Sequence, residues 1–398
     1  MNMNQNTNEM YPGKVALYHG PDKAVELLPM NWPAPQESQA LVRITHCAIC
    51  RSDVHTMCGR RHVQTPSVLG HEIIGHLVAV GASFSNTDFS GQTLNLGDRV
   101  TWAIYAHCGD CAFCRDGLPQ KCVQLFKYGH EAVSDTGEGS SGGMASYIML
   151  KSGTPILKLS DDISDHSATP INCAVATAAA MIRESDCKLD AHSVLVVMGG
   201  GYAGLSAVAL AKKQGCGKVL VFETNVELHK RCLEFGADAV FVPGDQAAIE
   251  CLNKWTRQRG VDLVLELAGS TDAAQLGLDQ LRTGGCLILA GTVFPSPPIR
   301  MDPDQIVRRC LTIKGSHNYR PEDLITATRF MCDTQDKLPW EQLVGGVFSL
   351  EDCNEAVQFE KITPVKGPSF RCVDYRSIKI ALRKKQGKLT SMSSQIFP

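Results

Sequence analysis

Residues 193–211, SVLVVMGGGYAGLSAVALA, join an apolar run of strand composition to an apolar run of helical composition through spaced glycines. Gly199, Gly201 and Gly204 follow the pattern G-x-G-x-x-G, which carries weight because a predicted strand precedes it and a predicted helix follows it. We expect Gly199 to make a tight turn, Gly201 to let the backbone approach a pyrophosphate, and Gly204 to allow close helix packing. The positive N-terminal end of that helix would face the phosphates. The alternative is that the glycines merely close a strand-to-helix turn.

The next predicted strand indicates which dinucleotide would bind. It covers residues 218–223 and ends at Glu223, about twenty residues after Gly201. A carboxylate at this position accepts hydrogen bonds from the adenosine ribose and repels a 2′-phosphate, so we expect NAD rather than NADP. His229 and Arg231 lie a little beyond Glu223 and would weaken that preference.

Strands and helices alternate from residue 174 to residue 317, which predicts a parallel sheet with crossover helices. Beyond Glu223 we expect helices at 225–237, 247–260 and 273–285, and strands at 239–244, 261–270 and 286–293. The fold class predicted for 174–317 is therefore α/β, a doubly wound Rossmann domain.

The flanking segments have a different character. Residues 14–173 contain short β-type runs broken by Gly, Pro and Asp, which favours an irregular all-β domain. Residues 318–375 are expected to return to that domain, so that the Rossmann domain is inserted within it. The polar N-terminus, 1–13, is expected to be disordered. The basic, Ser-rich tail, 376–398, is expected to be a solvated extension, with a basic amphipathic helix as the alternative.

Composition excludes several classes of protein. The chain has 398 residues, 44% hydrophobic and 20% charged, which suits two or three domains with a large core. A net charge of −2 provides no global field that would favour nucleic acid or a membrane surface. No run of about 18 apolar residues predicts a spanning helix, and the N-terminus lacks a signal-peptide core. Seventeen cysteines without a secretory signal indicate a reducing compartment, so we expect the cytoplasm.

The stretch HCGDCAFCRDGLPQKC, residues 107–122, predicts a metal site. Its spacing, C-x2-C-x2-C-x7-C, places four thiolates in one loop: Cys108, Cys111, Cys114 and Cys122. Tetrahedral Zn²⁺ needs four such donors at about 2.3 Å, whereas disulfides fit the adjacent x2 spacings poorly. Because protein would fill all four positions, we expect a closed, structural zinc site.

Three separate elements could assemble a second metal site: CRSDVH at 50–55, GHEIIG at 70–75, and Asn172-Cys173. Each alone is weak evidence, because a single Cys is usually a small core residue. Together they offer two thiolates and an imidazole, which leaves a fourth zinc position open for water or substrate, as in catalytic sites. Cys47 and Cys58 lie near Cys50 in the sequence and compete with it.

These motifs make the chain similar to the zinc-dependent medium-chain alcohol dehydrogenases over roughly residues 14–375. The resemblance rests on the four-cysteine loop, the glycine motif with its acidic partner, a Cys four residues before Thr177, and the segments 50–55, 70–75 and 97–100. It implies a GroES-like β catalytic domain beside a Rossmann domain, two Zn²⁺ per chain, and NAD. It further implies a small-molecule alcohol or carbonyl substrate and hydride transfer assisted by zinc as a Lewis acid.

The resemblance also implies a ligand set. Cys50, His71 and Cys173 would hold the catalytic zinc, and Cys50 is preferred because the Ser and Asp that follow it match the family motif. Asp53 would hold the zinc-bound imidazole in its tautomer. Glu72 would lie just behind the zinc and modulate its coordination.

The same resemblance assigns residues around the cofactor and substrate. Ser52 would hydrogen-bond the substrate oxygen, and His55 would end a proton relay that passes through the nicotinamide ribose. Arg51 would pair with the pyrophosphate, and Thr177 would pack near the nicotinamide.

Several segments resemble one branch of the family, the zinc dehydrogenases associated with phosphonate metabolism: 59–72, 127–131, 142–147, 151–156, 170–182 and 314–324. This branch implies a hydroxyalkyl- or oxoalkyl-phosphonate substrate, whose dianion needs cationic or N–H donors. Arg60, Arg61, His130 and His317 are candidates for that contact, and each could equally belong to a solvated surface. A neutral polyol or a primary alcohol is the alternative substrate.

Two other classes of protein compete with this interpretation. A zinc-lacking reductase of the same superfamily, acting on enones or quinones, would usually lack the Cys and His ligands. A non-catalytic, zinc-stabilised binding protein would be free to lose Ser52 and His55, which are both present. We expect a homodimer or homotetramer, with residues 286–301 as a candidate edge strand for pairing.

Overall fold

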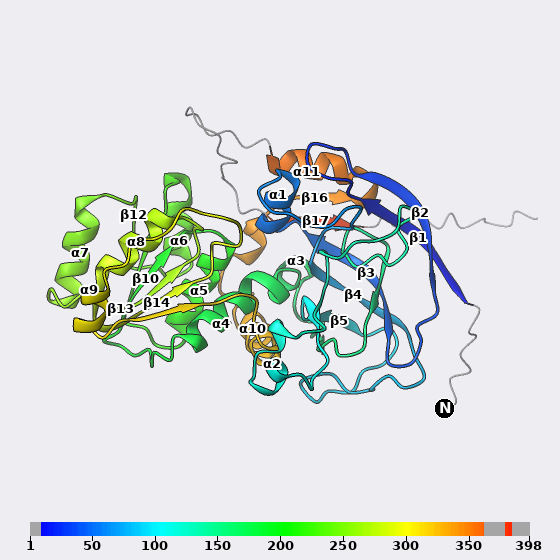
Figure 1. Cartoon of the computed structure of the whole chain (residues 1–398), viewed down its shortest axis with the longest axis horizontal. Coiled ribbons are helices and arrows are strands. Elements are labelled where there is room, and N and C mark those ends of the chain that lie inside the picture. The colour runs from blue at the N-terminus through cyan, green and yellow to red at the C-terminus, as the bar shows by residue number, and fades with distance from the viewer. Residues whose placement is uncertain (1–8, 362–378, 384–398) are drawn as a thin grey trace, which may run out of the picture.

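The computed structural model describes residues 9–361 and 379–383, which form two lobes joined by a central group of helices (Figure 1). The Rossmann lobe contains a six-stranded sheet, and the β lobe is built around a seven-stranded sheet. Two small two-stranded sheets, β1-β2 and β6-β7, accompany the β lobe. The chain enters and leaves the Rossmann lobe once, between two segments of the β lobe.

All neighbouring strands of the Rossmann sheet are parallel. The spatial order is β12-β11-β10-β13-β14-β15, and the bounds are β10 (Val194–Met198), β11 (Lys218–Phe222), β12 (Ala239–Phe241), β13 (Val261–Glu266), β14 (Leu281–Leu289) and β15 (Thr312–Gly315). The order reverses between β10 and β13, where doubly wound sheets bind ligands at the carboxyl ends of their strands. The predicted fold class is confirmed.

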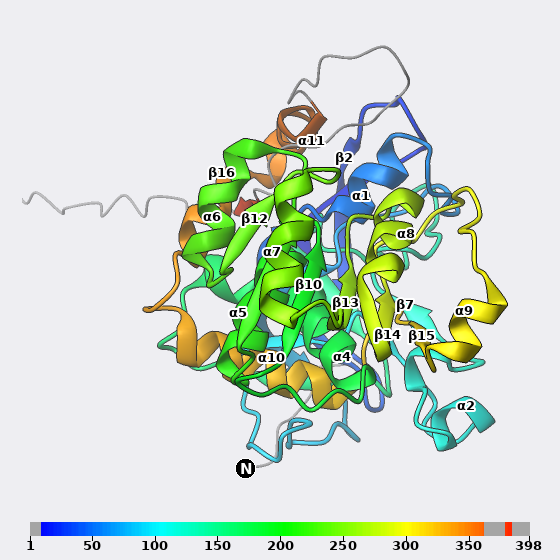
Figure 2. The same cartoon turned by 90° about the vertical axis from the view of Figure 1, so that its left-hand side faces the viewer.

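Helices cover both faces of this sheet because alternate strand residues point to opposite sides (Figure 2). Leu195 and Val197 pack in one buried cluster with α4 (Ala176–Glu184), α5 (Tyr202–Lys213) and α6 (His229–Glu234). Val196 and Met198 pack in another with α7 (Gln246–Thr256) and α8 (Thr271–Gln280). The short elements η3 (Val226–Leu228) and α9 (Pro303–Arg308) complete the lobe.

The β lobe has the irregular character that its short runs predict. Its main sheet has the order β16-β17-β3-β4-β5-β9, with β8 also paired to β3. The strands of the lobe are β1 (Met10–Leu17), β2 (Glu26–Pro33), β3 (Ala40–Ala48), β4 (Glu72–Val80), β5 (Arg99–Trp102), β6 (Tyr105–Ala106), β7 (Phe126–Lys127), β8 (Tyr147–Leu150), β9 (Ile156–Lys158), β16 (Val344–Ser349) and β17 (Lys379–Arg383). Its helical elements are α1 (Arg51–Met57), α2 (Ala112–Arg115), η1 (Pro119–Lys121), α3 (Asp165–Ala168), η5 (Leu350–Asp352) and α11 (Cys353–Lys361).

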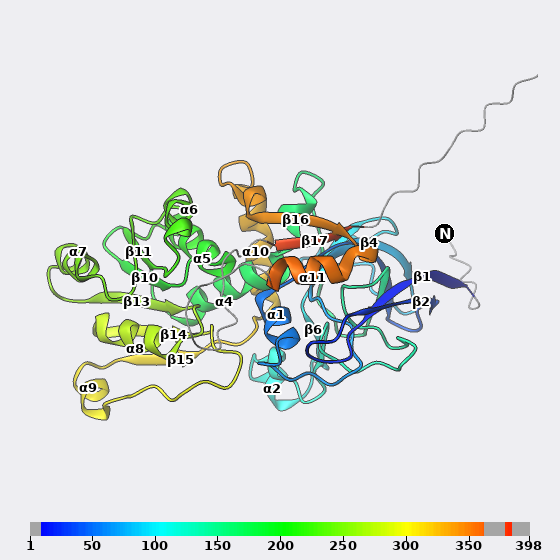
Figure 3. The ribbon, with the colours of Figure 1, turned by 90° about the horizontal axis from the view of Figure 1, so that it is seen from above.

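Three elements lie between the lobes: the π-helix η2 (Ile171–Val175), α4, which continues from it, and α10 (Pro321–Thr334), followed by η4 (Trp340–Leu343). Figure 3 shows α4 and α10 where the two lobes meet. One buried cluster extends across this region, from Ile74 and Tyr105 of the β lobe to Val197 of the Rossmann sheet and Trp340. The predicted limits of the two domains stay a prediction.

The sequence prediction differs from the structure at the start of β1, at residues 379–383 and at the predicted edge strand. Residues 379–383 form β17, which pairs in parallel with β16 and antiparallel with β3, instead of a solvated tail or a helix. Lys and Arg in this segment obscured the alternation of Ile378, Ile380 and Leu382, which has the period of a strand. The predicted edge strand, 286–301, is also wrong, because β14 is paired on both sides and β15 is the outer strand.

Two further predictions concern residues that lie partly or wholly outside 9–361 and 379–383. Residues 1–8 and 384–398 lie outside the described residues, so the calls made on them are not tested. Residues 10–13, in contrast, were expected to be disordered but begin strand β1 and pair with β2. Among the helices that are described, none has the length and apolar composition to cross a membrane.

Candidate metal centres and dinucleotide site

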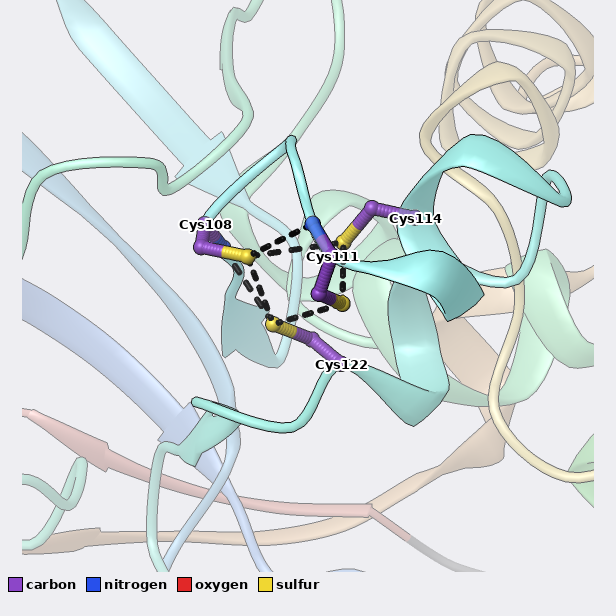
Figure 4. A group of neighbouring side chains, drawn as sticks. All are labelled: Cys108, Cys111, Cys114 and Cys122. Atoms are coloured by element: carbon purple, nitrogen blue, oxygen red, sulfur yellow. Dashed lines mark hydrogen bonds between the residues drawn. The ribbon is translucent and has the colours of Figure 1, made fainter.

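The four cysteines of the 107–122 loop lie together at the start of α2 and the end of η1 (Figure 4). We call Cys108, Cys111, Cys114 and Cys122 the closed group. Four of its sulfur–sulfur distances are 3.4, 3.6, 3.9 and 4.0 Å. Four sulfurs at about 2.3 Å from one Zn²⁺ would lie about 3.8 Å apart in a tetrahedron. The residues present therefore fit a zinc ion.

Backbone geometry favours thiolates in this loop. The N–H groups of Cys111 and Cys108 donate to the sulfurs of Cys108 and Cys122, at 3.4 and 3.3 Å. The backbone at Val123 and then at Cys114 lowers the pKa of the Cys111 thiol to about 6, whereas the side chain of Asp110 raises the pKa of Cys108 to about 12. Gly109 and Gly117 have φ of +82° and +74°, the left-handed region that lets the chain double back between ligands.

A second group draws its members from three distant parts of the chain. We call Cys50, His71, Glu72 and Cys173 the open group; one ligand atom from each lies within 4.8 Å of all the others. Cys50 is the N-cap of α1, His71 directly precedes β4, and Cys173 lies in the π-helix η2. π-Helical turns in otherwise α-helical segments are frequent at functional sites.

The distances in the open group suit a metal with Cys and His ligands. The sulfurs of Cys50 and Cys173 are 3.8 Å apart, and His71 Nε2 is 3.4 Å from the Cys173 sulfur. On the other side of the ring, Asp53 Oδ1 lies 3.3 Å from His71 Nδ1, and both side chains are almost fully buried. Burial lowers the pKa of His71, but Asp53 and Cys50 outweigh it and raise the pKa to about 10. The site thus stabilises positive charge, as a cation site requires.

Residues that the sequence did not single out support this group. Asn172 Nδ2 donates to the carbonyl oxygens of His71 at 3.1 Å and of Trp102 at 3.0 Å, which ties η2 to the β lobe. The hydroxyl of Tyr319 donates to the Asn172 carbonyl. Asn172 was quoted only as the neighbour of Cys173, and no local pattern marks Tyr319 as part of the site.

The two competing cysteines lie elsewhere. Cys47 is fully buried in the apolar core of the β lobe, where Gly70 and Gly143 pack against its sulfur. Cys58 ends α1 and lies near Tyr18. Among residues 9–361 and 379–383, neither belongs to a group that could hold a metal. Of the three cysteines in this region, the fold places only Cys50 beside His71 and Cys173.

The proposed relay residues lie on α1, one turn apart. Ser52 Oγ is 3.4 Å from His71 Nε2, on the metal-facing side of the ring. His55 is buried, and its ring lies 4.6 Å from that of Phe294, which comes from the loop after β14. Burial, followed by the charges of Arg51 and Arg60, lowers the pKa of His55 to about 4. Phe294 was missed because it contacts the site from the other lobe.

The glycine motif forms the turn between β10 and α5. Gly199 has φ of +100°, and a Cβ on Gly204 would lie 1.9 Å from the Gly199 carbonyl oxygen. Gly201 is the N-cap of α5 in extended conformation. Glu223, at the end of β11, is buried and accepts a 2.7 Å hydrogen bond from the N–H of Gly200. The acidic side chain therefore lies directly against the glycine turn, as dinucleotide-binding domains require.

The remaining predicted residues are placed as follows. Arg51 is the first residue of α1, and Thr177 is half-buried on α4 one turn beyond Cys173. The rings of His130 and His71 are 5.2 Å apart, whereas His317 follows β15 and is exposed. Arg60 and Arg61 follow α1 and are half-buried.

Comparison with known proteins agrees with this geometry. Residues 36–161 match the family model of the alcohol dehydrogenase GroES-like domain, and residues 203–333 match that of the zinc-binding dehydrogenase. The chain is 27% identical to a sorbitol dehydrogenase from Halalkalibacterium halodurans over 326 residues, 81% of this chain and 89% of that protein. It is 26% identical to a D-arabitol-phosphate dehydrogenase from Enterococcus avium over 340 residues, 84% and 89% of the two chains.

Solved structures share the fold. The crystal structure of an alcohol dehydrogenase from Thermotoga maritima superposes with a TM-score of 0.84 at 23% identity, over 94% of this chain and all of that one. A benzyl alcohol dehydrogenase from Acinetobacter calcoaceticus gives a TM-score of 0.78 at 22% identity, over 94% and 99% of the chains. The two family models match in order along the chain, and the chain therefore belongs to the zinc-dependent medium-chain alcohol dehydrogenase family, as an enzyme of alcohol oxidoreduction that uses zinc and a nicotinamide cofactor.

Proposed function

We propose that the chain transfers hydride between an alcohol, or its aldehyde or ketone, and NAD at the open group. The observation that supports this best is the convergence of Cys50, His71 and Cys173 from three distant elements, with a buried carboxylate behind the imidazole. These three residues would hold a zinc ion and leave one position for substrate. The bound ion would supply Lewis acidity toward the substrate oxygen. Glu72, buried in the same group, would modulate its coordination.

The proposed proton path starts at Ser52 and ends at His55. The Ser52 hydroxyl lies near the ligand atom of His71, where it could accept a hydrogen bond from a substrate hydroxyl and relay the proton by releasing its own toward the cofactor ribose and His55. His55 Nδ1 is buried and has no hydrogen-bond partner within residues 9–361, so it can accept a hydrogen bond from a cofactor hydroxyl. Its low pKa keeps the ring neutral at neutral pH. A bound pyrophosphate opposite Arg51 would offset one of the charges that lowers that pKa.

Glu223 supports NAD over NADP. Its carboxylate is held by the N–H groups of Gly200 and Asn225, at 2.7 and 2.8 Å, so it cannot easily turn away from a ribose. A 2′-phosphate would meet this fixed negative charge. His229 does not offset it directly, because its Nε2 hydrogen-bonds the Glu223 backbone carbonyl at 2.9 Å. Thr177 would pack near the nicotinamide, one helical turn from Cys173.

The closed group would hold the second zinc of each chain. All four of its donors come from protein, so this ion would have no open position and a structural role. We further propose that the enzyme acts in the cytoplasm as a homodimer or homotetramer. Because β15 is the outer strand of the Rossmann sheet, it takes the place of residues 286–301 as the candidate edge for pairing.

Two substrate classes follow from different observations. A hydroxyalkyl- or oxoalkyl-phosphonate is supported by the basic residues near the site, Arg61 above all. A neutral polyol is supported by the relatives named as sorbitol dehydrogenases. The relative named as a D-arabitol-phosphate dehydrogenase combines a polyol with an anionic group.

Metal content and turnover test the proposal together. We expect purified protein to contain two zinc ions per chain and to reduce NAD in the presence of an alcohol, with NADP less effective. The assay is zinc analysis by mass spectrometry beside NADH absorbance, with hydroxyalkyl phosphonates, polyols and primary alcohols as substrates. Protein with one zinc or none per chain, or fully zinc-loaded protein that oxidises no alcohol with either dinucleotide, would contradict the proposal.

A further inference from the structure

Four basic residues, Arg61, Lys121, Lys127 and His317, gather beside the open group, and we call them the basic wall. They come from the segment after α1, the end of η1, strand β7 and the segment after β15. Lys127 is the member on which both cysteines of the open group act, and the sequence did not single it out. Three features of the wall bear on substrate binding. Its segments are fixed in place, its charges act on one another, and two of its cations lack a counter-charge.

The segment carrying Lys127 is fixed against the metal ligand His71. The N–H of His130 donates to the Lys127 carbonyl at 3.2 Å and closes a turn. At the middle of that turn, Gly129 has φ of +74°, and a Cβ there would lie 2.7 Å from the Gly70 carbonyl and 3.2 Å from His71 Cβ. Only glycine allows so close an approach. The backbone of Lys127 is therefore positioned relative to the open group.

The opposite side of the wall is fixed to the element that carries Cys173. Tyr105 Oη donates to the Tyr319 carbonyl at 2.8 Å, and Tyr319 in turn hydrogen-bonds the Asn172 carbonyl. Two residues before Tyr319, His317 Nδ1 accepts a 2.6 Å hydrogen bond from Lys121 Nζ. A neutral His317 then carries its proton on Nε2 and can donate it to an anion.

The charges of the wall act on one another. Burial and then the charge of Arg61 lower the pKa of Lys127 to about 8, and the thiols of Cys173 and Cys50 raise it. Although the His317 side chain keeps an exposed surface, partial desolvation and then Lys127, Lys121 and Arg61 lower its pKa to about 4. Arg51, Arg60 and, to a lesser extent, Arg61 act on His55, whereas Arg61 is the one of these three arginines that acts on Lys127. Arg61, rather than Arg60, is therefore grouped with Lys127.

Two members of the wall, Arg61 and Lys127, lack anionic partners in the described part of the chain. No ion pair joins Arg61 or Lys127 to a carboxylate there, and Glu131 accepts from the backbone N–H of Lys127 rather than from its ammonium group. Glu184 is the acidic residue that acts on Lys121. The thiolates of Cys50 and Cys173 would be neutralised by a bound Zn²⁺. Half-buried cations with no counter-charge are costly, and an anionic ligand would relieve that cost.

We propose that the substrate carries a tetrahedral oxyanion, a phosphonate or a phosphate monoester, that Lys127 and Arg61 bind while its alcohol carbon faces the open group. This inference rests on the proposed function and adds Lys127 as the residue that selects the substrate. His317 Nε2–H would donate one further hydrogen bond. His130 is not a binder, because its Nδ1 is already 2.8 Å from the Tyr128 carbonyl and its ring packs on His71.

The test compares Lys127→Gln with Lys151→Gln in the zinc-loaded enzyme. Lys151 is a matched control because it is an exposed lysine on the same lobe, placed 4.1 Å over the Phe126 ring. The substrates are 2-hydroxyethylphosphonate, 2-hydroxyethyl phosphate and 1-propanol. We expect wild type to prefer one or both anions, and Lys127→Gln to lower kcat/KM for that anion by about 10- to 100-fold, as for a lost charge-assisted hydrogen bond.

The same change should lower kcat/KM for 1-propanol much less than kcat/KM for the anion, and Lys127→Arg should restore most of the loss for the anion. Calorimetric titration with methylphosphonate should show a Kd about 10-fold higher or more in Lys127→Gln, and an unchanged Kd in Lys151→Gln. The anion that reacts faster identifies the source of the oxyanion.

Three results would overturn the inference: wild type that prefers 1-propanol, equal losses for anionic and neutral substrates, or methylphosphonate binding that is the same in Lys127→Gln and wild type. In each case zinc-loaded wild type still oxidises an alcohol, so the proposed function stands. Zinc-loaded wild type that oxidises none of the three, nor any alcohol of the wider panel, would instead contradict the proposed function.

Discussion

The closed and open groups contain the same soft ligands but are assembled in opposite ways. The closed group takes four cysteines from one loop, and three of the four are only partly buried. The open group takes its members from three elements that span 123 positions from Cys50 to Cys173, and places His71 and Glu72 in the interior. A flexible loop and a metal ion are enough to form the closed group, whereas the open group also needs a folded protein that holds its three elements in place.

The two groups also differ in which parts of the chain hydrogen-bond their ligands. The sulfurs of the closed group are hydrogen-bonded by the backbone of their own loop. His71 of the open group is instead held by Asp53 from α1 and by Asn172 from η2. Metal loss should therefore unfold the first site locally and disable the second chemically. Four experiments test this contrast, from the largest expected effect to the smallest.

Removing a ligand of the open group should have the largest effect. We expect Cys173→Ser to lower kcat/KM by more than about 1,000-fold, because the several kcal/mol of Lewis-acid stabilisation is lost. One zinc per chain should remain, and the melting temperature should change little. Cys251→Ser, a half-buried cysteine on α7 outside both groups, is the control. A variant that keeps both zinc ions and normal turnover would exclude Cys173 as a ligand.

Removing a ligand of the closed group should instead affect stability. Cys111→Ser is expected to lose one zinc and to lower the free energy of unfolding by several kcal/mol, because the loop is ordered by its metal. Thermal melting with zinc analysis measures both, and Cys310→Ser, an exposed cysteine, is the control. If Cys111→Ser were stable and fully zinc-loaded, the division between a structural and a catalytic site would have to be abandoned.

The buried carboxylate provides an intermediate test. Asp53→Asn should weaken zinc binding at the open group, or lower kcat/KM, by about 10- to 100-fold, since it removes the charge behind the His71 ring. Competition with a zinc chelator measures the affinity. Asp116→Asn, an exposed carboxylate in the closed loop, should change neither quantity. Equal effects of the two changes would mean that both groups depend on carboxylate support.

The smallest expected effect concerns pH. Burial lowers the pKa of His55 to about 4 from a usual value near 6.5, so the unfolded chain binds a proton that the folded chain does not. Stability from this residue is present above about pH 6.5 and is lost as the pH falls toward about 4. His55→Gln should therefore show a smaller fall in melting temperature over that window. Parallel profiles for the two proteins would contradict the buried, neutral state of His55.

Most of the fold could be predicted from local patterns. The glycine motif and the alternation that follows it predicted the parallel sheet, because strands buried on both faces are continuous apolar runs. The strand β17 was missed, because basic residues masked its alternation and its partners β16 and β3 are distant in sequence. The edge at 286–301 was misplaced for a related reason, since the order of strands depends on a pairing with β15 that local sequence does not specify.

The sequence predicted some residues of the site and missed others. Cys50, Ser52 and Asp53 stand in one motif, and the family resemblance connected them with His71 and Cys173. Asn172, Phe294 and Lys127 were not predicted, because their roles arise from contacts between segments far apart in the chain. Of the four basic candidates, Arg60 acts on His55 and the His130 ring hydrogen-bonds the Tyr128 carbonyl, whereas Arg61 and His317 belong to the basic wall.

The sequence by itself determined the closed group, the glycine turn and the order of strands and helices, because each depends on residues close together in the chain. The tertiary structure decided which of Cys47, Cys50 and Cys58 lies beside His71, and which cations face the same site. Those choices depend on packing between lobes, where burial and neighbouring charge act over a few ångströms of space regardless of distance along the chain.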